Sequence, residues 1–121
     1  MNTVLVTGGS KGIGSAVAEE FASLGYAVAI NYNKSEEKAK ALSLELMKKY
    51  KVPVGAYKAD VKDRNEVAHM VAKIKDELGT IVILVNNAGI STQKEISQIT
   101  NDEWKVMLST HLDGAFNCTQ E

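Results

Sequence analysis

Short runs of apolar residues alternate along the chain with longer stretches in which apolar positions recur every three or four residues. The short runs predict four β-strands, at Thr3–Thr7, Tyr26–Tyr32, Val52–Ala59 and Ile81–Val85. The longer stretches predict four helices, over Gly12–Leu24, Ser35 to about Tyr50, Asp63–Leu78 and Thr100 to the end of the chain. This alternation predicts an α/β fold, a doubly wound parallel sheet with helices on both faces and right-handed crossovers.

Polar residues mark where the predicted helices begin. Ser35 is a candidate N-cap followed by two glutamates, and acidic residues in a first turn favour the helix dipole. Asp63–Glu66 and Thr100–Glu103 have the spacing of capping boxes. The fourth strand, Ile81–Val85, is apolar at every position, which predicts a strand buried on both faces.

Composition narrows the class of protein. A chain of 121 residues with 45% hydrophobic and 24% charged residues is an ordinary globular domain rather than a disordered one. The net charge of −1 gives no electrostatic footprint for nucleic acid or an anionic membrane. One cysteine excludes a disulfide framework, and there is neither a secretory signal nor an apolar run long enough to span a bilayer. We therefore expect a cytoplasmic protein, and we predict no metal site.

The first predicted strand leads into a glycine-rich turn with the sequence TGGSKGIG at Thr7–Gly14. Glycine lets the chain turn sharply off a strand and lets backbone amides approach a pyrophosphate, while the next helix supplies its positive dipole. Ser10 adds a hydroxyl donor and Lys11 a cation. Glycines alone are common in strand-to-helix turns, but this position, with Ser and Lys inside the loop, predicts phosphate binding.

The end of the second strand indicates which dinucleotide binds. An Asp or Glu usually holds a free ribose 2′-hydroxyl there, but no carboxylate occurs before Glu36. Instead Asn31–Lys34 offers neutral polar groups and a cation, which with Lys11 suits a 2′-phosphate. The prediction is NADP(H) rather than NAD(H); the alternative is that Lys34 simply faces solvent.

Two further strand ends carry polar residues. Asp60 follows the third strand, where its carboxylate could accept from an adenine amino group or cap the next turn. Asn86–Gly89 follows the fourth strand, and two amides beside two small residues suit the close approach of a flat ligand. An Asx-type turn without a ligand is the alternative for Asn86–Gly89.

Four segments together resemble the N-terminal half of the classical short-chain dehydrogenases/reductases. They are TGGSKGIG at Thr7–Gly14, ADV at Ala59–Val61, LVNNAG at Leu84–Gly89 and W-x-x-x-L-x-x-x-L-x-G-x-F at Trp104–Phe116. Within that family, INYNKSEEKAK resembles the 3-oxoacyl-(acyl-carrier-protein) reductase branch of fatty acid biosynthesis. The resemblance covers essentially the whole chain and implies a Rossmann-type fold and NADP(H)-dependent reduction of a 3-oxoacyl thioester or similar ketone.

The resemblance also assigns roles to individual residues. It implies that the pyrophosphate side is held by Gly8, Ser10, Lys11, Gly12, Ile13 and Gly14. The 2′-phosphate would be surrounded by Tyr32, Asn33 and Lys34. Asp60 and Val61 would border the adenine, and the ribose nearer the nicotinamide would meet Asn87, Ala88 and Gly89.

The catalytic residues of the family do not occur in this sequence. The family uses a serine and a Tyr-x-x-x-Lys pair, and none of the four tyrosines here has a lysine four residues later. His111 stands where the family usually has asparagine, and Val82 where it usually has aspartate. We therefore expect the chain to be inactive alone; the alternative is a non-catalytic NADP(H)-binding or interaction module.

The last predicted helix continues to Glu121 without a stop signal, its apolar stripe running through Trp104, Met107, Leu108, Leu112, Ala115 and Thr119. Residues 1–121 are thus expected to be the N-terminal NADP-binding half of a Rossmann-type domain, truncated inside a helix. The resemblance then implies strand order 3-2-1-4, with Ile81–Val85 at an edge. A homodimer through that strand or the last helix is a further expectation.

Overall fold

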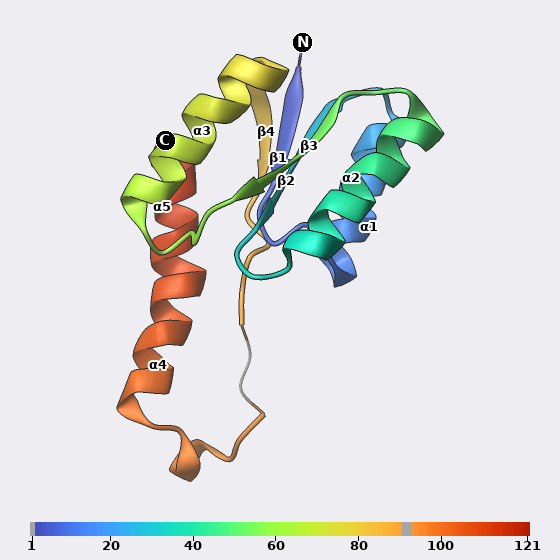
Figure 1. Cartoon of the computed structure of the whole chain (residues 1–121). Coiled ribbons are helices and arrows are strands. Elements are labelled where there is room, and N and C mark those ends of the chain that lie inside the picture. The colour runs from blue at the N-terminus through green and yellow to red at the C-terminus, as the bar shows by residue number, and fades with distance from the viewer. Residues whose placement is uncertain (1, 91–92) are drawn as a thin grey trace.

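The computed structural model describes residues 2–90 and 93–121 (Figure 1). Its strands are β1 (Thr3–Val6), β2 (Ala27–Tyr32), β3 (Val54–Lys58) and β4 (Ile81–Val85). The helices are α1 (Gly12–Ser23), α2 (Glu36–Tyr50), α3 (Arg64–Leu78), α4 (Asn101–Leu108) and α5 (Gly114–Gln120). All strand pairs are parallel and their order is β3-β2-β1-β4, so the predicted fold class and topology are confirmed.

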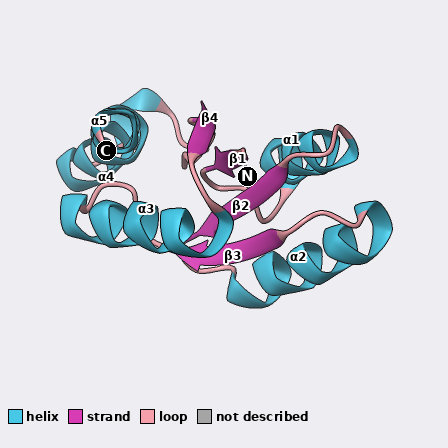
Figure 2. Ribbon diagram, turned by 90° about the horizontal axis from the view of Figure 1, so that it is seen from above, coloured by secondary structure: helices cyan, strands magenta, loops and turns pink. Residues whose placement is uncertain are grey.

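The helices cover both faces of the sheet, as double winding requires (Figure 2). Helices α1 and α2 lie on one face, and α3 and α5 lie on the other. The long segment formed by α4 and α5 extends beyond the edge of the sheet at which the strands end (Figure 1). In the described part of the chain, no helix is both long and apolar enough to cross a membrane.

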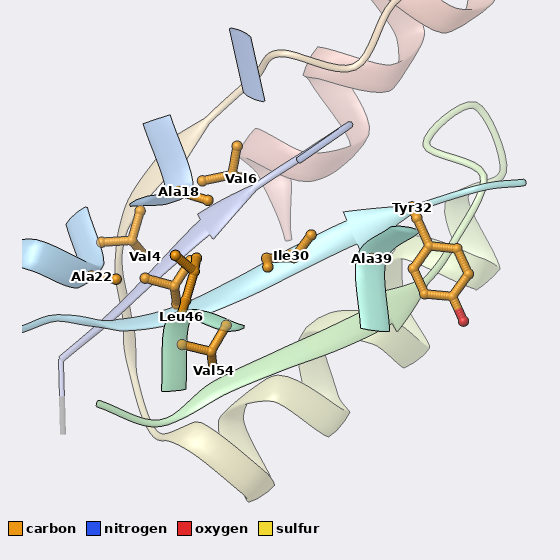
Figure 3. Close-up of a cluster of buried hydrophobic side chains, with 10 residues drawn as sticks. Val4, Val6, Ala18, Ala22, Ile30, Tyr32, Ala39, Leu46 and Val54 are labelled. Carbon is orange, nitrogen blue, oxygen red and sulfur yellow. The ribbon is translucent and has the colours of Figure 1, made fainter. Parts of the chain in front are cut away.

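The larger core lies between the sheet and the α1–α2 layer (Figure 3). Val4, Val6 and Ile30 from the strands are completely buried there. The facing helix positions are small, with Ala18 and Ala22 on α1, and small residues let a helix approach a sheet closely. Each large aliphatic side chain removed from water contributes roughly 1.5–3 kcal/mol, so this face anchors the sheet.

Two of the three predicted helix caps form. The Asp63 carboxylate accepts hydrogen bonds from the amides of Asn65 and Glu66, at 3.0 and 3.2 Å. The Thr100 hydroxyl accepts from the Glu103 amide at 3.1 Å. Ser35 occupies the N-cap position of α2, but its side chain makes no capping hydrogen bond.

Strand β4 is an edge strand, as the predicted strand order requires, but the prediction that it is buried on both faces was wrong. The register of β1 against β4 shifts between Thr3, which faces Ile81, and Val4, which faces Ile83. Val82 therefore has no partner in β1, and 48% of its surface is exposed. An all-apolar strand is normally covered on both faces, but here the sheet ends at β4.

The last helix departs from the predicted single amphipathic helix. A π-helical segment, Ser109–Asp113, separates α4 from α5. The apolar stripe also faces outward, because Trp104 is 53%, Leu112 64% and Phe116 58% exposed. The inward face of α5 is formed by small and polar residues, Gly114, Asn117 and Cys118.

Candidate functional site

An open cavity of about 600 Å³ lies where the strands end. Carboxyl ends of parallel strands meet at one edge of a sheet, and ligands of open α/β sheets bind in the crevice outside it. Most of the residues predicted from the sequence line this cavity: Gly8, Ser10, Lys11, Tyr32, Asn33, Lys34, Asp60, Val61, Asn87, Ala88 and Gly89. Gly12, Ile13 and Gly14, which were predicted with them, do not line it.

The glycine-rich loop owes its shape to two different glycine properties. Gly8 and Gly12 have positive φ angles of 61° and 59°, which L-residues with side chains rarely adopt. Gly14 is buried, and a Cβ there would collide with the Gly8 carbonyl and stand 2.5 Å from Nδ2 of Asn87. Ile13, by contrast, is 77% exposed. Gly12 and Gly14 thus determine the shape of the turn, but they do not form part of the surface of the cavity.

Thr7 and Asn87 join the loop after β1 to the loop after β4. The Thr7 hydroxyl accepts hydrogen bonds from the amides of Asn87 and Ala88, at 3.0 and 2.9 Å. In return, the Asn87 side-chain amide donates to the carbonyls of Thr7 and Gly8, at 3.1 and 3.0 Å. The predicted tight polar turn is therefore present, and the Asn87 amide group holds the glycine-rich loop. Thr7 was not predicted as part of the site, although its position just before the glycines was the available signal.

Asn31 makes the matching connection between the other two strand ends. Its Oδ1 accepts from the Gly8 amide at 3.1 Å, and its Nδ2 donates to the Ala59 carbonyl at 3.0 Å and the Tyr57 carbonyl at 3.3 Å. The residue is only 2% exposed. Asn31 was predicted as a neutral polar group for the ligand; it lines the cavity and is also a buried link that holds the cavity wall.

Asn33 and Lys34 are exposed at the cavity, beyond the end of β2. Tyr32 also lines the cavity, yet most of its side chain is buried in the α1–α2 core. Burial, followed by the nearby Glu36 carboxylate, raises the pKa of Tyr32, so its hydroxyl stays protonated at neutral pH. Tyr32 therefore presents the cavity with a neutral group.

The cations at this end of the cavity are not neutralised. Glu36 pairs with Lys40 at 2.7 Å, and the hydrogen bond from that ammonium lowers the pKa of Glu36. Among the described residues, neither Lys11 nor Lys34 forms an ion pair. A negatively charged ligand would therefore meet two free ammonium groups.

The sequence left two roles open for Asp60, capping the next turn and accepting from an adenine amino group, and its position is compatible with both. One carboxylate oxygen accepts from the Lys62 amide at 3.1 Å, and the other pairs with the Lys62 ammonium. The turn-capping interpretation is thus present in the structure, and the carboxylate still lines the cavity. Val61 is mostly buried, because a Cβ on Gly114 would lie 2.6 Å from it and Asn117 donates to its carbonyl at 3.0 Å.

His111 lies in the π-helical segment and contacts the loop after β4. Its Nε2 is 3.1 Å from the Ile90 amide nitrogen and 2.7 Å from the Ile90 carbonyl oxygen. The neutral ring accepts from the amide in one tautomer and donates to the carbonyl in the other. The ring also lies over Gly89, where a Cβ would stand 2.9 Å from Nδ1. In the described residues, no cluster of three His, Cys, Asp or Glu side chains could hold a metal.

Comparison with known proteins agrees with this geometry. The family model for short chain dehydrogenases matches residues 2–121. The chain belongs to the short-chain dehydrogenase family.

Among curated relatives of the chain, a Staphylococcus aureus 3-oxoacyl-(acyl-carrier-protein) reductase is 40% identical over 98% of the chain. An acetoacetyl-CoA reductase of Paracoccus denitrificans is 38% identical over 95% of it. The chain spans about half the length of these relatives, 48% and 45% respectively.

Solved structures give the same result. An alcohol dehydrogenase of the archaeon Thermococcus sibiricus, complexed with 5-hydroxy-NADP, superposes with a TM-score of 0.92 at 28% identity. That match covers 99% of this chain and 51% of the archaeal one. A Serratia marcescens short-chain dehydrogenase/reductase mutant superposes with a TM-score of 0.91 at 33% identity, covering 98% and 48%.

Replacing Asn31 by aspartate tests whether this buried link holds the short-chain dehydrogenase fold. In Asn31→Asp, a carboxylate oxygen would face the carbonyls of Tyr57 and Ala59 in place of a donor. We expect unfolding free energy to fall by roughly 3 kcal/mol in urea titrations at neutral pH. Asn33→Asp is the matched control, because Asn33 is exposed; it should change stability by less than about 0.5 kcal/mol. Equal effects of the two variants would contradict the assignment.

Proposed function

We propose that residues 1–121 form the NADP(H)-binding half of an oxidoreductase that reduces a 3-oxoacyl thioester or a similar ketone. The observation that carries the proposal is the cavity at the strand ends, with its glycine-rich loop and two lysines, Lys11 and Lys34, that form no ion pair among the described residues. The 3-oxoacyl and acetoacetyl names of the relatives support the substrate class. The NADP analogue named with the archaeal structure supports the cofactor.

The residues at the cavity fit the phosphate and ribose groups of this cofactor. Its volume of about 600 Å³ lies within the range of small-molecule sites. Ser10 and Lys11 line the cavity just before α1 begins, so a pyrophosphate would meet a hydroxyl, an ammonium and a helix N-terminus. Gly14 keeps this loop close to Asn87, because any side chain there would force them apart.

The remaining roles follow from position along the cavity. Lys34 and Asn33 would hold the 2′-phosphate, while Asp60 and Val61 would border the adenine. Ala88 and Gly89 would face the ribose nearer the nicotinamide, since their loop lies at the opposite, β4 side of the sheet. The bound nicotinamide would supply a hydride to the substrate carbonyl carbon.

We further propose a cytoplasmic role in fatty acid biosynthesis. The support is the 40% identity to a 3-oxoacyl-(acyl-carrier-protein) reductase. Cys118, the single cysteine, is buried against Val61, Val67 and Val71, and burial raises the pKa of its thiol to about 11. A single cysteine cannot form a disulfide within the chain, which fits a reducing compartment.

Lys34→Asp tests the cofactor assignment. The substitution replaces an ammonium by a carboxylate, which would repel a 2′-phosphate and could accept from a free 2′-hydroxyl. We expect the dissociation constant for NADPH to rise on the order of 100-fold, and that for NADH to change only a few-fold. Isothermal titration calorimetry measures both constants, and Lys38→Asp on the exposed face of α2 is the charge-matched control. Equal losses for the two dinucleotides would show that Lys34 does not contact the phosphate.

The 121-residue chain alone should not catalyse the reaction. No tyrosine in the sequence is followed by lysine four residues later, so the family's proton donor is absent from these residues. We expect NADPH absorbance to decay no faster than the blank when the purified chain is mixed with an acetoacetyl thioester. Oxidation above the blank that depends on the thioester would refute this and require another acid group in these residues.

We also propose that two copies pair through the β4 edge. Val82 is exposed and has no partner in β1, whereas Ile83 packs on the core and is a poor test position. Light scattering should show that Val82→Lys converts the dimer to a monomer, because a charge blocks edge-to-edge pairing. The control Val82→Thr should remain a dimer.

Leu112→Lys tests the other predicted surface, the last helix. A monomeric parent chain, or a dimer lost only in Leu112→Lys, would overturn pairing through β4.

A further inference from the structure

The Asp60–Lys62 pair is a feature of the cavity that the proposed phosphate and ribose contacts leave unused. Lys62 engages the Asp60 carboxylate twice, through its backbone amide at 3.1 Å and through its ammonium. Both side chains line the cavity and are partly exposed, at 21% for Asp60 and 38% for Lys62. A ligand in the cavity thus meets an acceptor and a donor side by side.

Neither group of the pair has exhausted its hydrogen-bonding capacity. A carboxylate offers about four lone-pair sites and an ammonium three donors, and the contacts within the described chain use two sites on Asp60 and one donor on Lys62. The turn geometry holds the pair in place, because the Asp60 amide donates to Glu66 at 3.2 Å while the Asp60 carboxylate accepts from the Lys62 amide. The free sites therefore remain available to a ligand.

This arrangement matches two purine edges equally well. Adenine presents an amino donor at position 6 beside the acceptor N1, and hypoxanthine presents a carbonyl acceptor at position 6 beside the donor N1–H. A carboxylate and an ammonium can satisfy either edge by exchanging which atom each one contacts. A carboxylate alone would satisfy the adenine amino group but would face the hypoxanthine oxygen without a donor.

We propose that Lys62 is a specificity-determining residue that makes this subsite tolerant of both 6-amino and 6-oxo purine dinucleotides. The proposal rests on the proposed NADP(H)-binding function. Lys62 supplies the donor that Asp60 lacks, and it also competes with the adenine amino group for the Asp60 carboxylate. Its removal should create a preference for adenine that the parent chain does not have.

Binding of NADPH and of its hypoxanthine counterpart, reduced nicotinamide hypoxanthine dinucleotide phosphate, tests the proposal. We expect the dissociation constants of the parent chain for the two dinucleotides to agree within about threefold. In Lys62→Met, the ratio of these constants should shift by about tenfold in favour of NADPH, which corresponds to the loss of one charge-assisted hydrogen bond. The ratio is the readout, because losing a positive charge near the cavity weakens both ligands alike. Lys75→Met, on the exposed last turn of α3 and away from the cavity, should keep the parent ratio.

The outcomes separate the two proposals. If the parent chain binds both dinucleotides but Lys62→Met leaves their ratio unchanged, or if the parent already prefers NADPH tenfold, the role of Lys62 is overturned alone. If the parent binds neither dinucleotide, the NADP(H) proposal fails and the Lys62 proposal fails with it. Far-UV circular dichroism matching the parent shows that the variants are folded; Lys62 is exposed, so we expect this match.

Discussion

A network of side-chain hydrogen bonds at the carboxyl edge of the sheet holds the ends of all four strands, and the cavity depends on it. Thr7 and Asn87 join the ends of β1 and β4, and Asn31 joins β2 to Gly8 and to the carbonyls at the end of β3. These side chains satisfy backbone groups just beyond the strand ladders, and leaving such a buried group unsatisfied costs about 1–3 kcal/mol. The Asn31 amide both accepts and donates, whereas the Asn87 amide group donates twice and the Thr7 hydroxyl supplies the acceptor. The glycine-rich loop is therefore held in place before any ligand arrives.

The sequence predicted the fold and most of the cavity because both depend on local patterns. The alternation of short apolar runs with helix-period stretches located every strand. The polar residues that follow each strand were predicted to lie together, and they line the cavity. The role of Asn31 could not be predicted in this way. Its partners lie 23, 26 and 28 residues away in the sequence, and a buried asparagine and an exposed one look alike until the strands are paired. The prediction that β4 is buried on both faces failed for a related reason, since an apolar run by itself does not reveal where the sheet ends.

Charge is distributed around the cavity so that carboxylates are paired and selected ammonium groups are left free. Glu36 lies beside Lys40, and Asp60 lies beside Lys62, so neither carboxylate opposes an anion at full strength. Exposed pairs of this kind add little to stability, typically less than about 1 kcal/mol. They leave Lys11 and Lys34 as cavity-lining lysines that form no ion pair in the described chain. Under the proposed function, these two ammonium groups would meet the cofactor phosphates although the whole chain carries a net charge of −1.

The last helix shows why an apolar stripe does not always identify the buried face. Close backbone approach decides the contact here, since Gly114 lies against Val61 and the Asn117 amide donates to the Val61 carbonyl at 3.0 Å. A bulky residue at position 114 would hold the helix away from the loop after β3 and break that hydrogen bond. The π-helical segment before Gly114 changes the rotation of the helix, and it carries His111 against Gly89 and Ile90. Docking by Gly114 therefore turns Leu112 and Phe116 outward and couples the helix to the cavity through His111. Trp104, Leu112 and Phe116 are therefore exposed along this segment, and the core contact is made by the small residue instead.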